Sequence, residues 1–319
     1  MRNAFADEIT RLGATDQRIV LLAGDIGNKL FDRFKEQNPN RFFNCGLGEA
    51  NMMSVAAGLA LCGFRPVVYT ITPFATTRCL EQIRDDACYH RAPVVIVGTG
   101  AGLSYAELGP THHSCEDIAF LRVLPEMTVL CPCDAVELRL ALRATLRHEG
   151  PVYLRIGKKG EPVIYAEPPE YHIGRAITVR QGTDVCLIST GNIMPVVLGA
   201  ADLLGSTGIS ARVESFHTVK PLDHDRLAEV FAHYPVVAVA EEHSRIGGLG
   251  SSIAEWLVGQ DGLPGRLLSF GTTDEFMHEV GSQAYARRRF GLTPERIAAA
   301  VQTRWEAQRT IRVARVAKE

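Results

Sequence analysis

The sequence of 319 residues lacks an excess of charge of either sign. Lysine and arginine number 34 and aspartate and glutamate 36, so the formal net charge is −2. The sequence contains neither a basic patch nor a charged run, which argues against a nucleic-acid-binding surface or a charged tail. The longest apolar stretches are interrupted by glycine, proline or a charge within about a dozen residues, too few to cross a bilayer. We therefore expect neither a nucleic-acid nor a membrane partner.

Cysteine is present, but without the spacing of a metal site. The eight cysteines are scattered, and the only close pair, Cys131 and Cys133, falls at the expected end of a strand. We interpret them as free, buried thiols in a reducing cytosol rather than as metal ligands. Because Met1 leads directly into the amphipathic stretch FADEITRLG, we expect no signal peptide and a cytoplasmic location.

Apolar, β-rich runs alternate with helical patterns along the whole chain. The first runs are continuous rather than alternating, as is typical of parallel strands covered on both faces; they are RIVLLAG, RFFNC, RPVVYTI, PVVIVGT, MTVLCP and PVYLRI. After a bridge rich in lysine, proline and glycine, the alternation restarts with DVCLIST, SARVESF, VVAVAEE and RLLSFGT. We predict two parallel-sheet α/β domains, over residues 1–165 and 183–319, joined by a linker over residues 166–182.

A lone carboxylate, Glu49, heads the small and apolar segment CGLGEANMMSVAAGLAL. Taken alone, it is explained as a first-turn glutamate that complements the positive end of a helix. The small residues that follow would let this helix pack closely on a neighbour, where a carboxylate is costly unless something interacts with it. The run YTITPF would bring Phe74 to the carboxyl edge of the same sheet, where ligands bind in open α/β folds. We expect acid and ring to share one crevice, although Phe74 alone would be explained as a core residue.

Six segments in order resemble the C-terminal half of transketolase-type enzymes, which use thiamine diphosphate. The segments are GLGEANMMSVAAGLAL, YTITPFATTRCLEQIRDDA, GPTHHSCEDIAFLRVLPEMTVLCPCDAVE, PVYLRIGKKG, SFHTVKPLD and EEHSRIGGLGS. Each is a weak signal by itself, but together they cover nearly the whole chain. The resemblance implies a pyrimidine-binding domain followed by the family's C-terminal domain. It also implies transfer of a two-carbon ketol (glycolaldehyde) unit to an aldehyde from a ketose, which we expect to be phosphorylated.

The resemblance assigns roles to the residues of the expected crevice. In the family, the glutamate matching Glu49 hydrogen-bonds a ring nitrogen of the cofactor's aminopyrimidine and so promotes loss of a proton from the thiazolium carbon. The carbanion formed there attacks the substrate carbonyl, and the cofactor acts as the electron sink. Phe74 matches the aromatic residue that stacks on the pyrimidine. Asp25 and Asn28, in the run GDIGN, fall on a family loop that lines the cleft, and we expect them to contact cofactor and substrate, respectively.

The run ELGPTHHSCED contains two adjacent histidines. The resemblance places His112 on the histidine that faces the substrate and the reacting carbon, where an imidazole can move protons near neutral pH. A nucleophilic pair of His112 with Cys115 is not favoured, because neither an orienting third group nor an oxyanion site is evident. His113 and Arg78 are expected to contact the substrate. Arg155 matches an arginine that binds the substrate phosphate, which suits a planar guanidinium; an ion pair at a strand end is the alternative.

Two positions depart from the transketolase pattern. An aspartate that reads a substrate hydroxyl is replaced by Leu108, and a second histidine near the substrate phosphate is replaced by Gly100. Since a hydrogen bond to a charged group is worth about 1.5–3 kcal/mol, we expect the usual sugar phosphates to be poor substrates.

The chain lacks the motif with which the family holds the cofactor's diphosphate through Mg²⁺, namely Gly-Asp-Gly followed by Asn-Asn. The run GDIGN with Asn51 imitates it, but the third glycine and second asparagine are absent. Moreover, Asn51 shares a helical turn with Glu49, which would serve the opposite end of the cofactor. We therefore expect no metal ligand in this chain. A partner subunit would supply the diphosphate and Mg²⁺ domain, in an α2β2 heterotetramer.

Three interpretations follow. The first is the small subunit of a split transketolase. The second is the β subunit of a 2-oxo acid dehydrogenase or a deoxyxylulose-phosphate-synthase-like enzyme, and the third a catalytically silent scaffold. The run GPTHHS with Arg155 favours ketol transfer, and the joint presence of Glu49, Phe74 and His112 argues against a scaffold.

Overall fold

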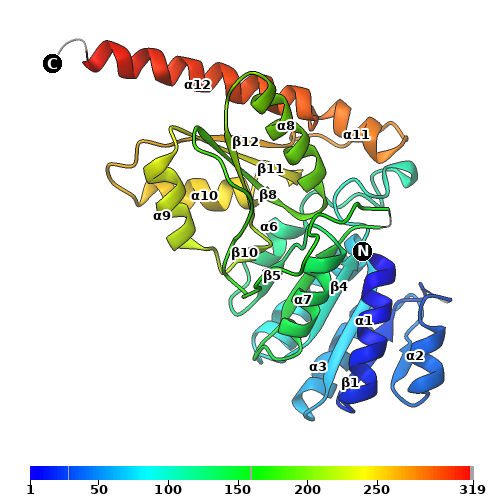
Figure 1. Cartoon of the computed structure of the whole chain (residues 1–319). Helices are drawn as coiled ribbons and strands as arrows, with labels where there is room; N and C mark the ends of the chain where they lie inside the picture. The colour runs from blue at the N-terminus through cyan, green and yellow to red at the C-terminus, as the bar shows by residue number, and fades with distance from the viewer. Residues whose placement is uncertain (28, 159, 317–319) are drawn as a thin grey trace.

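The chain folds into two α/β domains, one below and one above in Figure 1. The computed structural model describes residues 1–27, 29–158 and 160–316. The first domain is built on a seven-stranded sheet in the order β10-β5-β6-β4-β3-β1-β2, where β10 is Thr218–Lys220. Six of its strands are parallel and coincide with the first six predicted runs: β1 (Ile19–Ala23), β2 (Phe42–Asn44), β3 (Arg65–Ile71), β4 (Val95–Thr99), β5 (Thr128–Leu130) and β6 (Val152–Ile156).

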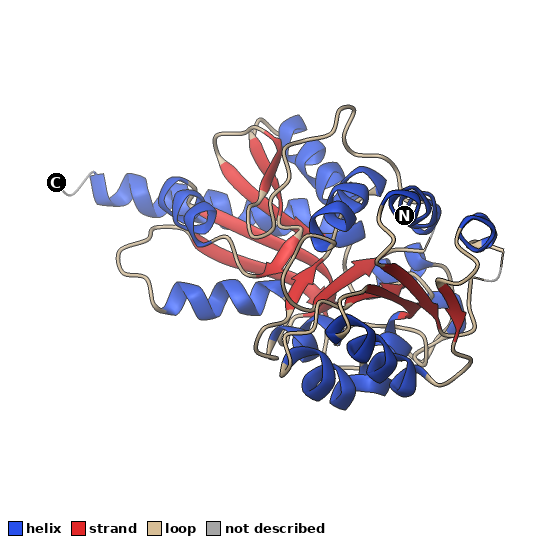
Figure 2. Cartoon of the chain, turned by 90° about the horizontal axis from the view of Figure 1, so that it is seen from below, coloured by secondary structure: helices blue, strands red, loops and turns tan. Residues whose placement is uncertain are grey.

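Helices cover both faces of this sheet, as Figure 2 shows in the lower-right part of the molecule. Two helices, α1 (Arg2–Thr15) and α7 (Ala135–Thr145), pack together on one face, and α3 (Glu49–Leu61) packs against β3 on the other. The shorter helical segments are α2 (Asp32–Gln37), α4 (Thr72–Ala75), α5 (Leu80–Gln82), a π-helical turn (Ile83–Cys88) and α6 (Asp117–Arg122). Burial on both faces explains why the strands are continuous apolar runs.

The second domain contains a five-stranded sheet in the order β12-β11-β8-β9-β7. Its parallel strands are β8 (Val185–Thr190), β9 (Ala211–Ser215), β11 (Val236–Ser244) and β12 (Arg266–Thr272). Its helices are α8 (Met194–Ser206), α9 (His224–His233), α10 (Leu249–Val258), α11 (Gln283–Arg289) and α12 (Pro294–Val316). The prediction of two α/β domains with parallel sheets is thereby confirmed, with one antiparallel edge strand added to each sheet.

Neither antiparallel strand was expected from the sequence. Residues 177–180, inside the predicted linker, form β7 (Ile177–Arg180), which pairs with β9 at the edge of the second sheet. Strand β10 (Thr218–Lys220) follows β9 in the chain but crosses to the first domain, where Thr218 pairs with Leu130. Neither strand belongs to a continuous apolar run, as the similarly short β2 and β5 do, so pairing with its partner decides its conformation.

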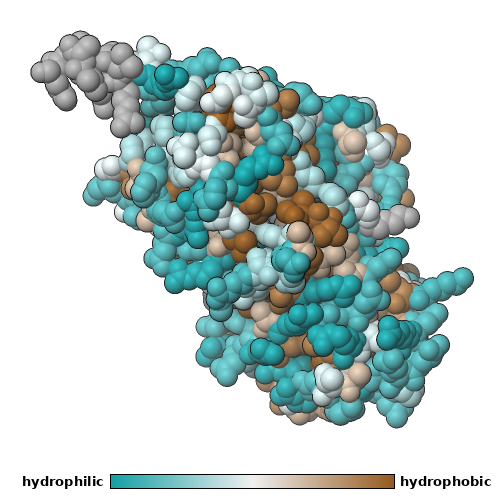
Figure 3. Space-filling view, viewed as in Figure 1, coloured by the Kyte–Doolittle hydropathy of each residue, from teal (hydrophilic) through white to brown (hydrophobic). Residues whose placement is uncertain are grey.

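The two domains share part of one hydrophobic core. A single cluster of buried side chains contains Met52 and Ile96 of the first domain together with Ile188 and Phe231 of the second. In the space-filling view, apolar side chains gather near the middle of the visible face, and hydrophilic side chains cover most of the rest (Figure 3). No described helix combines the length and the apolar character that a membrane span needs.

The buried carboxylate of Glu8 gives the first domain a dependence on pH. Burial alone would raise its pKa, but hydrogen bonds from Arg11 and Arg143 outweigh burial and lower the pKa from 4.5 to about 2. Because the pKa in the folded state is depressed, Glu8 stabilises the fold above about pH 5 and loses this contribution as the pH falls towards 2. We expect Glu8→Gln to reduce the loss of melting temperature between pH 6 and pH 3, measured by circular dichroism. An unchanged pH profile would contradict this role.

Candidate active site

The carboxylate of Glu49 is buried at the first turn of α3 and has one free oxygen. Its side chain is 1% exposed, and Nη1 of Arg78 donates a hydrogen bond of 2.8 Å to Oε2. The other oxygen, Oε1, is buried without a hydrogen-bond partner. The end of β1 approaches so closely that a Cβ atom on Gly24 would lie 3.2 Å from Cγ of Glu49. A buried, unpartnered carboxylate oxygen is costly, so this atom is available to bond a ligand.

Phe74 and Arg78 lie beside this carboxylate. Both follow β3 at its carboxyl end, Phe74 within α4 and Arg78 in the next turn. The guanidinium carbon of Arg78 lies 4.1 Å from the centroid of the Phe74 ring, within the range of a cation–π contact. Arg78 therefore contacts the acid and the aromatic ring at the same time.

His112 completes this group from the loop between β4 and α6. Its ring meets the Phe74 ring edge to face, with 5.4 Å between centroids. The hydroxyl of Thr111 lies 3.0 Å from Nδ1 of His112, which leaves Nε2 as the nitrogen available to a ligand. The structure thus brings together Glu49, Phe74, Arg78 and His112, although they come from three separate segments of the chain.

Two residues beside His112 were missed by sequence reasoning. The Tyr105 ring lies 6.3 Å from that of His112, and Nζ of Lys158 lies 4.6 Å from the Tyr105 centroid and pairs with Glu107. A clue was the glycine at position 100: it has φ of +80°, and a Cβ atom there would lie only 1.9 Å from the Tyr105 ring. The tyrosine ring therefore occupies the space beside Gly100, where the transketolase pattern led us to expect a histidine.

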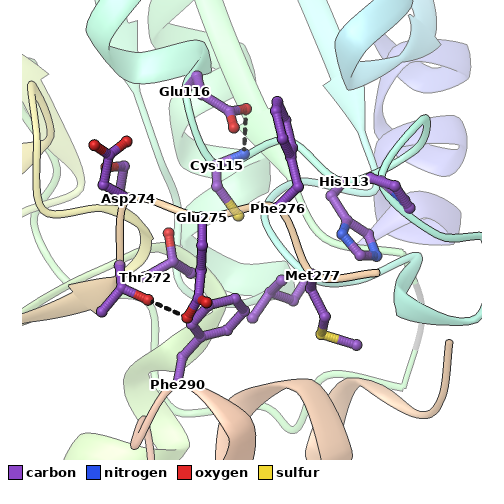
Figure 4. A pocket seen from close by; sticks show the side chains of 13 residues that line it. His113, Cys115, Glu116, Thr272, Asp274, Glu275, Phe276, Met277 and Phe290 are labelled. Carbon is purple, nitrogen blue, oxygen red and sulfur yellow. Dashed lines mark hydrogen bonds between the residues drawn. The ribbon is translucent and has the colours of Figure 1, made fainter. Parts of the chain in front are cut away.

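His113 faces a different region from His112. It lines a cavity of about 280 Å³ between loops of the two domains (Figure 4). Its Nε2 is buried without a partner, and burial lowers the pKa of the imidazole below 6.5. The other lining residues are Leu103, Pro110, Cys115, Glu116, Ser244, Thr272, Thr273, Asp274, Glu275, Phe276, Met277 and Phe290. The structure does not bring His113 to the group around Glu49.

Arg155 is also separate from that group. It is 2% exposed, and its guanidinium forms two hydrogen bonds with Asp117, of 2.7 and 3.2 Å. It also donates to the backbone oxygens of Ser114 and Glu242, and so joins the two domains. With its charge paired and these donors engaged, the guanidinium occupies a structural position. The expected contact with a substrate phosphate is not favoured by this geometry.

The remaining predicted residues lie at the end of β1 or outside the described residues. Asp25 has φ of +51° and exchanges hydrogen bonds of 2.9 and 3.2 Å with Asn44, directly after the glycine that abuts Glu49. Asn28 lies outside the described residues. Leu108 is largely exposed at the end of a 3₁₀ turn, Ala106–Leu108. Across residues 1–27, 29–158 and 160–316, no three His, Cys, Asp or Glu side chains are grouped to hold a metal ion.

Comparison with known families identifies both domains. Residues 1–161 match the model of the transketolase pyrimidine binding domain, and residues 174–297 that of the transketolase C-terminal domain. The chain belongs to the transketolase family. Membership of this family implies that the chain depends on thiamine diphosphate.

Relatives of similar length include named transketolase subunits. The chain is 37% identical to the 6-deoxy-6-sulfo-D-fructose transketolase subunit SqwH of Clostridium sp. strain MSTE9, over 93% of this chain and 92% of that protein. It is 33% identical to an apulose-4-phosphate transketolase subunit of Phocaeicola vulgatus, over 93% of this chain and 94% of that protein. A solved structure, described as a split gene transketolase, inactive beta4 tetramer, is 36% identical, with a TM-score of 0.87 over 96% of this chain and 98% of that chain.

Longer relatives are named for a different reaction. The 1-deoxy-D-xylulose-5-phosphate synthase of Heliobacterium modesticaldum is 34% identical over 96% of this chain, which spans only 47% of that protein. The transketolase-family chain thus corresponds to about half of such an enzyme.

The residues of the site fit one end of thiamine diphosphate. The free Oε1 of Glu49 can exchange a hydrogen bond with a pyrimidine ring nitrogen, and Phe74 supplies apolar surface beside it. A buried acid next to an aromatic ring suits a flat, basic heterocycle.

Proposed function

We propose that the chain is the C-terminal subunit of a two-chain transketolase, a transferase that moves a two-carbon ketol unit from a ketose to an aldehyde. The proposal rests on the buried carboxylate of Glu49, which keeps one oxygen unpartnered beside Phe74 and within the same cluster as His112. Bound thiamine diphosphate would supply an electron sink for the carbon that is transferred.

Each residue of the cluster has a distinct task in this proposal. Glu49 exchanges a proton with a pyrimidine nitrogen through Oε1, since its other oxygen is held by Arg78. Phe74 supports the heterocycle and helps to exclude water. His112 holds or moves a proton at a substrate oxygen through Nε2, because Thr111 engages Nδ1. Asp25, at the end of β1, contacts the cofactor in this proposal.

A partner subunit is needed to complete this site. We propose that it carries the Gly-Asp-Gly and Asn-Asn motif, holds Mg²⁺ and the diphosphate, and assembles with this chain as α2β2. In support, two exposed apolar side chains come shortly before Glu49 in the chain: Leu47 is 78% and Phe43 47% exposed. Such side chains suit an interface. The related beta4 tetramer, which is described as inactive, is consistent with a subunit that requires a second chain.

We propose that the ketose carries an anionic group. The cation of Lys158 lies beside Tyr105, which neighbours His112. Unlike the buried pair of Arg155, its ion pair with Glu107 is partly exposed, so an anionic ligand can compete with that carboxylate. Two relatives are named for a sulfo sugar and a phosphorylated sugar, both of which are anionic. Replacement of the expected aspartate by Leu108 favours a donor whose recognition does not depend on that carboxylate.

Reconstitution tests the proposed function. The chain would be purified with the product of a neighbouring reading frame that carries the Mg²⁺ motif, and thiamine diphosphate binding measured by calorimetry. We expect binding to the complex, followed by ketol transfer from an anionic ketose to an aldehyde, with xylulose 5-phosphate a poorer donor because Leu108 replaces the aspartate that reads its hydroxyl. Absence of cofactor binding would refute the proposal. Turnover of pyruvate in its place would favour a synthase-like or 2-oxo acid dehydrogenase reaction, and a cofactor-bound but inactive complex would favour a scaffold.

Lys158 is expected to determine the affinity for an anionic donor. In the reconstituted complex, Lys158→Met should raise KM for a charged ketose about 10- to 100-fold with kcat little changed, because a charge-assisted hydrogen bond is lost. KM for an uncharged ketose should stay the same. Arg84→Met, which removes an exposed cation in the first domain, is the matched control. An equal rise in KM for both donors would contradict this role.

A further inference from the structure

The loop that carries Tyr105 and His112 rests on the second domain. It starts after β4, and at Gly102 it passes so close to β11 that a Cβ atom would lie 2.5 Å from the backbone oxygen of Glu242. Leu103 and Ala106 of the loop are buried in a hydrophobic cluster completed by second-domain side chains, among them Ile193, Met277, Ala286 and Leu292. The position of the loop therefore depends on the second domain as well as on the first.

A fully buried carboxylate, Glu242 of β11, lies under this loop. Nε2 of Gln283 donates to both of its oxygens, at 2.9 and 3.1 Å. Arg287 donates to the same oxygens at 3.2 and 3.3 Å, and Arg287 is itself only 17% exposed. Both donors come from α11, so the carboxylate binds this helix to β11.

The same polar groups reach the loop through Ser104. The hydroxyl of Ser104 accepts a hydrogen bond of 3.0 Å from Nδ2 of Asn192 and a longer one of 3.4 Å from Nε2 of Gln283. Arg287 also donates to the backbone oxygen of Asn192, at 3.1 Å. Ser104 directly precedes Tyr105, whose ring contacts His112. A continuous set of hydrogen bonds thus leads from Glu242 to Ser104, the residue before Tyr105.

We propose that Glu242, Arg287, Gln283 and Ser104 form a positioning cluster, through which the C-terminal domain fixes Tyr105 and His112 relative to Glu49. A buried ion pair is no better for stability than apolar packing of the same volume, because its desolvation cost offsets the attraction. Its directional bonds do, however, hold one arrangement of a loop. Only the expected effect on the reaction rests on the proposed function. The positioning of the loop does not, since every residue of the cluster belongs to this chain.

Hydrogen exchange of the isolated chain tests the positioning without any activity. We expect Arg287→Gln and, separately, Ser104→Ala to speed amide exchange in peptides covering residues 100–114 about tenfold, with the peptides of β4 and β6 unchanged. Arg289→Gln is the matched control on the same helix, because Arg289 pairs with the partly exposed Glu275 instead. Equal acceleration throughout the chain, or none in residues 100–114, would overturn the proposal. Ser104→Ala decides the question if Arg287→Gln does not fold.

Kinetics of the reconstituted complex supply the second readout. We expect Arg287→Gln to lower kcat about 10- to 100-fold, since a small displacement of reacting groups is costly, while the dissociation constant of thiamine diphosphate stays within about twofold. Arg287→Lys, which keeps the charge, should recover part of the loss. An unchanged kcat, or a loss that Lys does not relieve at all, would contradict positioning. If the wild-type complex has no transketolase activity, the proposed function fails while the exchange result still stands.

Discussion

Replacing Glu49 by glutamine is expected to lower ketol transfer by the reconstituted complex about 10²- to 10⁴-fold, the range typical of a lost acid–base group. Glutamine has nearly the same shape, so the packing of the side chain against Gly24 is kept. An amide cannot exchange a proton with a ring nitrogen, and it leaves Arg78 without its ion-pair partner. Steady-state kinetics would give the loss in kcat, and calorimetry the accompanying change in cofactor affinity.

Glu81→Gln is the control for this substitution. Glu81 is an exposed acid of α5. It accepts a long hydrogen bond of 3.5 Å from the side chain of the adjacent Gln82. We expect the control to keep the wild-type rate. A Glu49→Gln complex with full activity would remove the carboxylate from the mechanism and favour a different acid, or a subunit that contributes no chemistry.

Replacing Arg155 by methionine is expected to reduce the free energy of unfolding by about 3–5 kcal/mol, because it leaves the carboxylate of Asp117 buried and uncompensated. Asp117 is fully buried and also accepts a hydrogen bond of 2.5 Å from the Tyr153 hydroxyl. Burial alone would raise the pKa of Asp117, but the Arg155 cation outweighs burial and lowers it. Urea unfolding at neutral pH, followed by circular dichroism, measures the loss.

A double variant separates this structural role from the substrate role that the resemblance implied. Adding Asp117→Asn removes the charge that Arg155→Met leaves unpaired. The double variant should therefore lose less free energy of unfolding than the two single variants lose in sum, by about 1 kcal/mol or more. Full stability of Arg155→Met, together with a raised KM for a charged ketose alone, would instead support a contact with the substrate phosphate.

The sequence predicted the central strands because they are long, continuous apolar runs whose character is local. It could not predict β7 or β10, since each lies outside the continuous apolar runs and is defined by an antiparallel partner on another segment of the chain. Within the site, the order of motifs pointed to Glu49, Phe74 and His112, which the structure brings together. The glycine at position 100 was the one hint of Tyr105, but the residue itself was not predicted, because the tertiary structure decides which ring folds over that glycine.

The amino-acid sequence by itself determined the two α/β domains, the family, and which acid, aromatic ring and histidine we propose for the thiamine cofactor and the substrate, because these follow from local patterns and motif order. Only the tertiary structure decided which part of the molecule each of these side chains faces, even when two of them are adjacent in the sequence. His113 lies against an inter-domain cavity while His112 meets Phe74, and Arg155 is enclosed by Asp117 and Glu242. The physical reason is that burial and pairing depend on how the second domain packs over the loop, which no local pattern records.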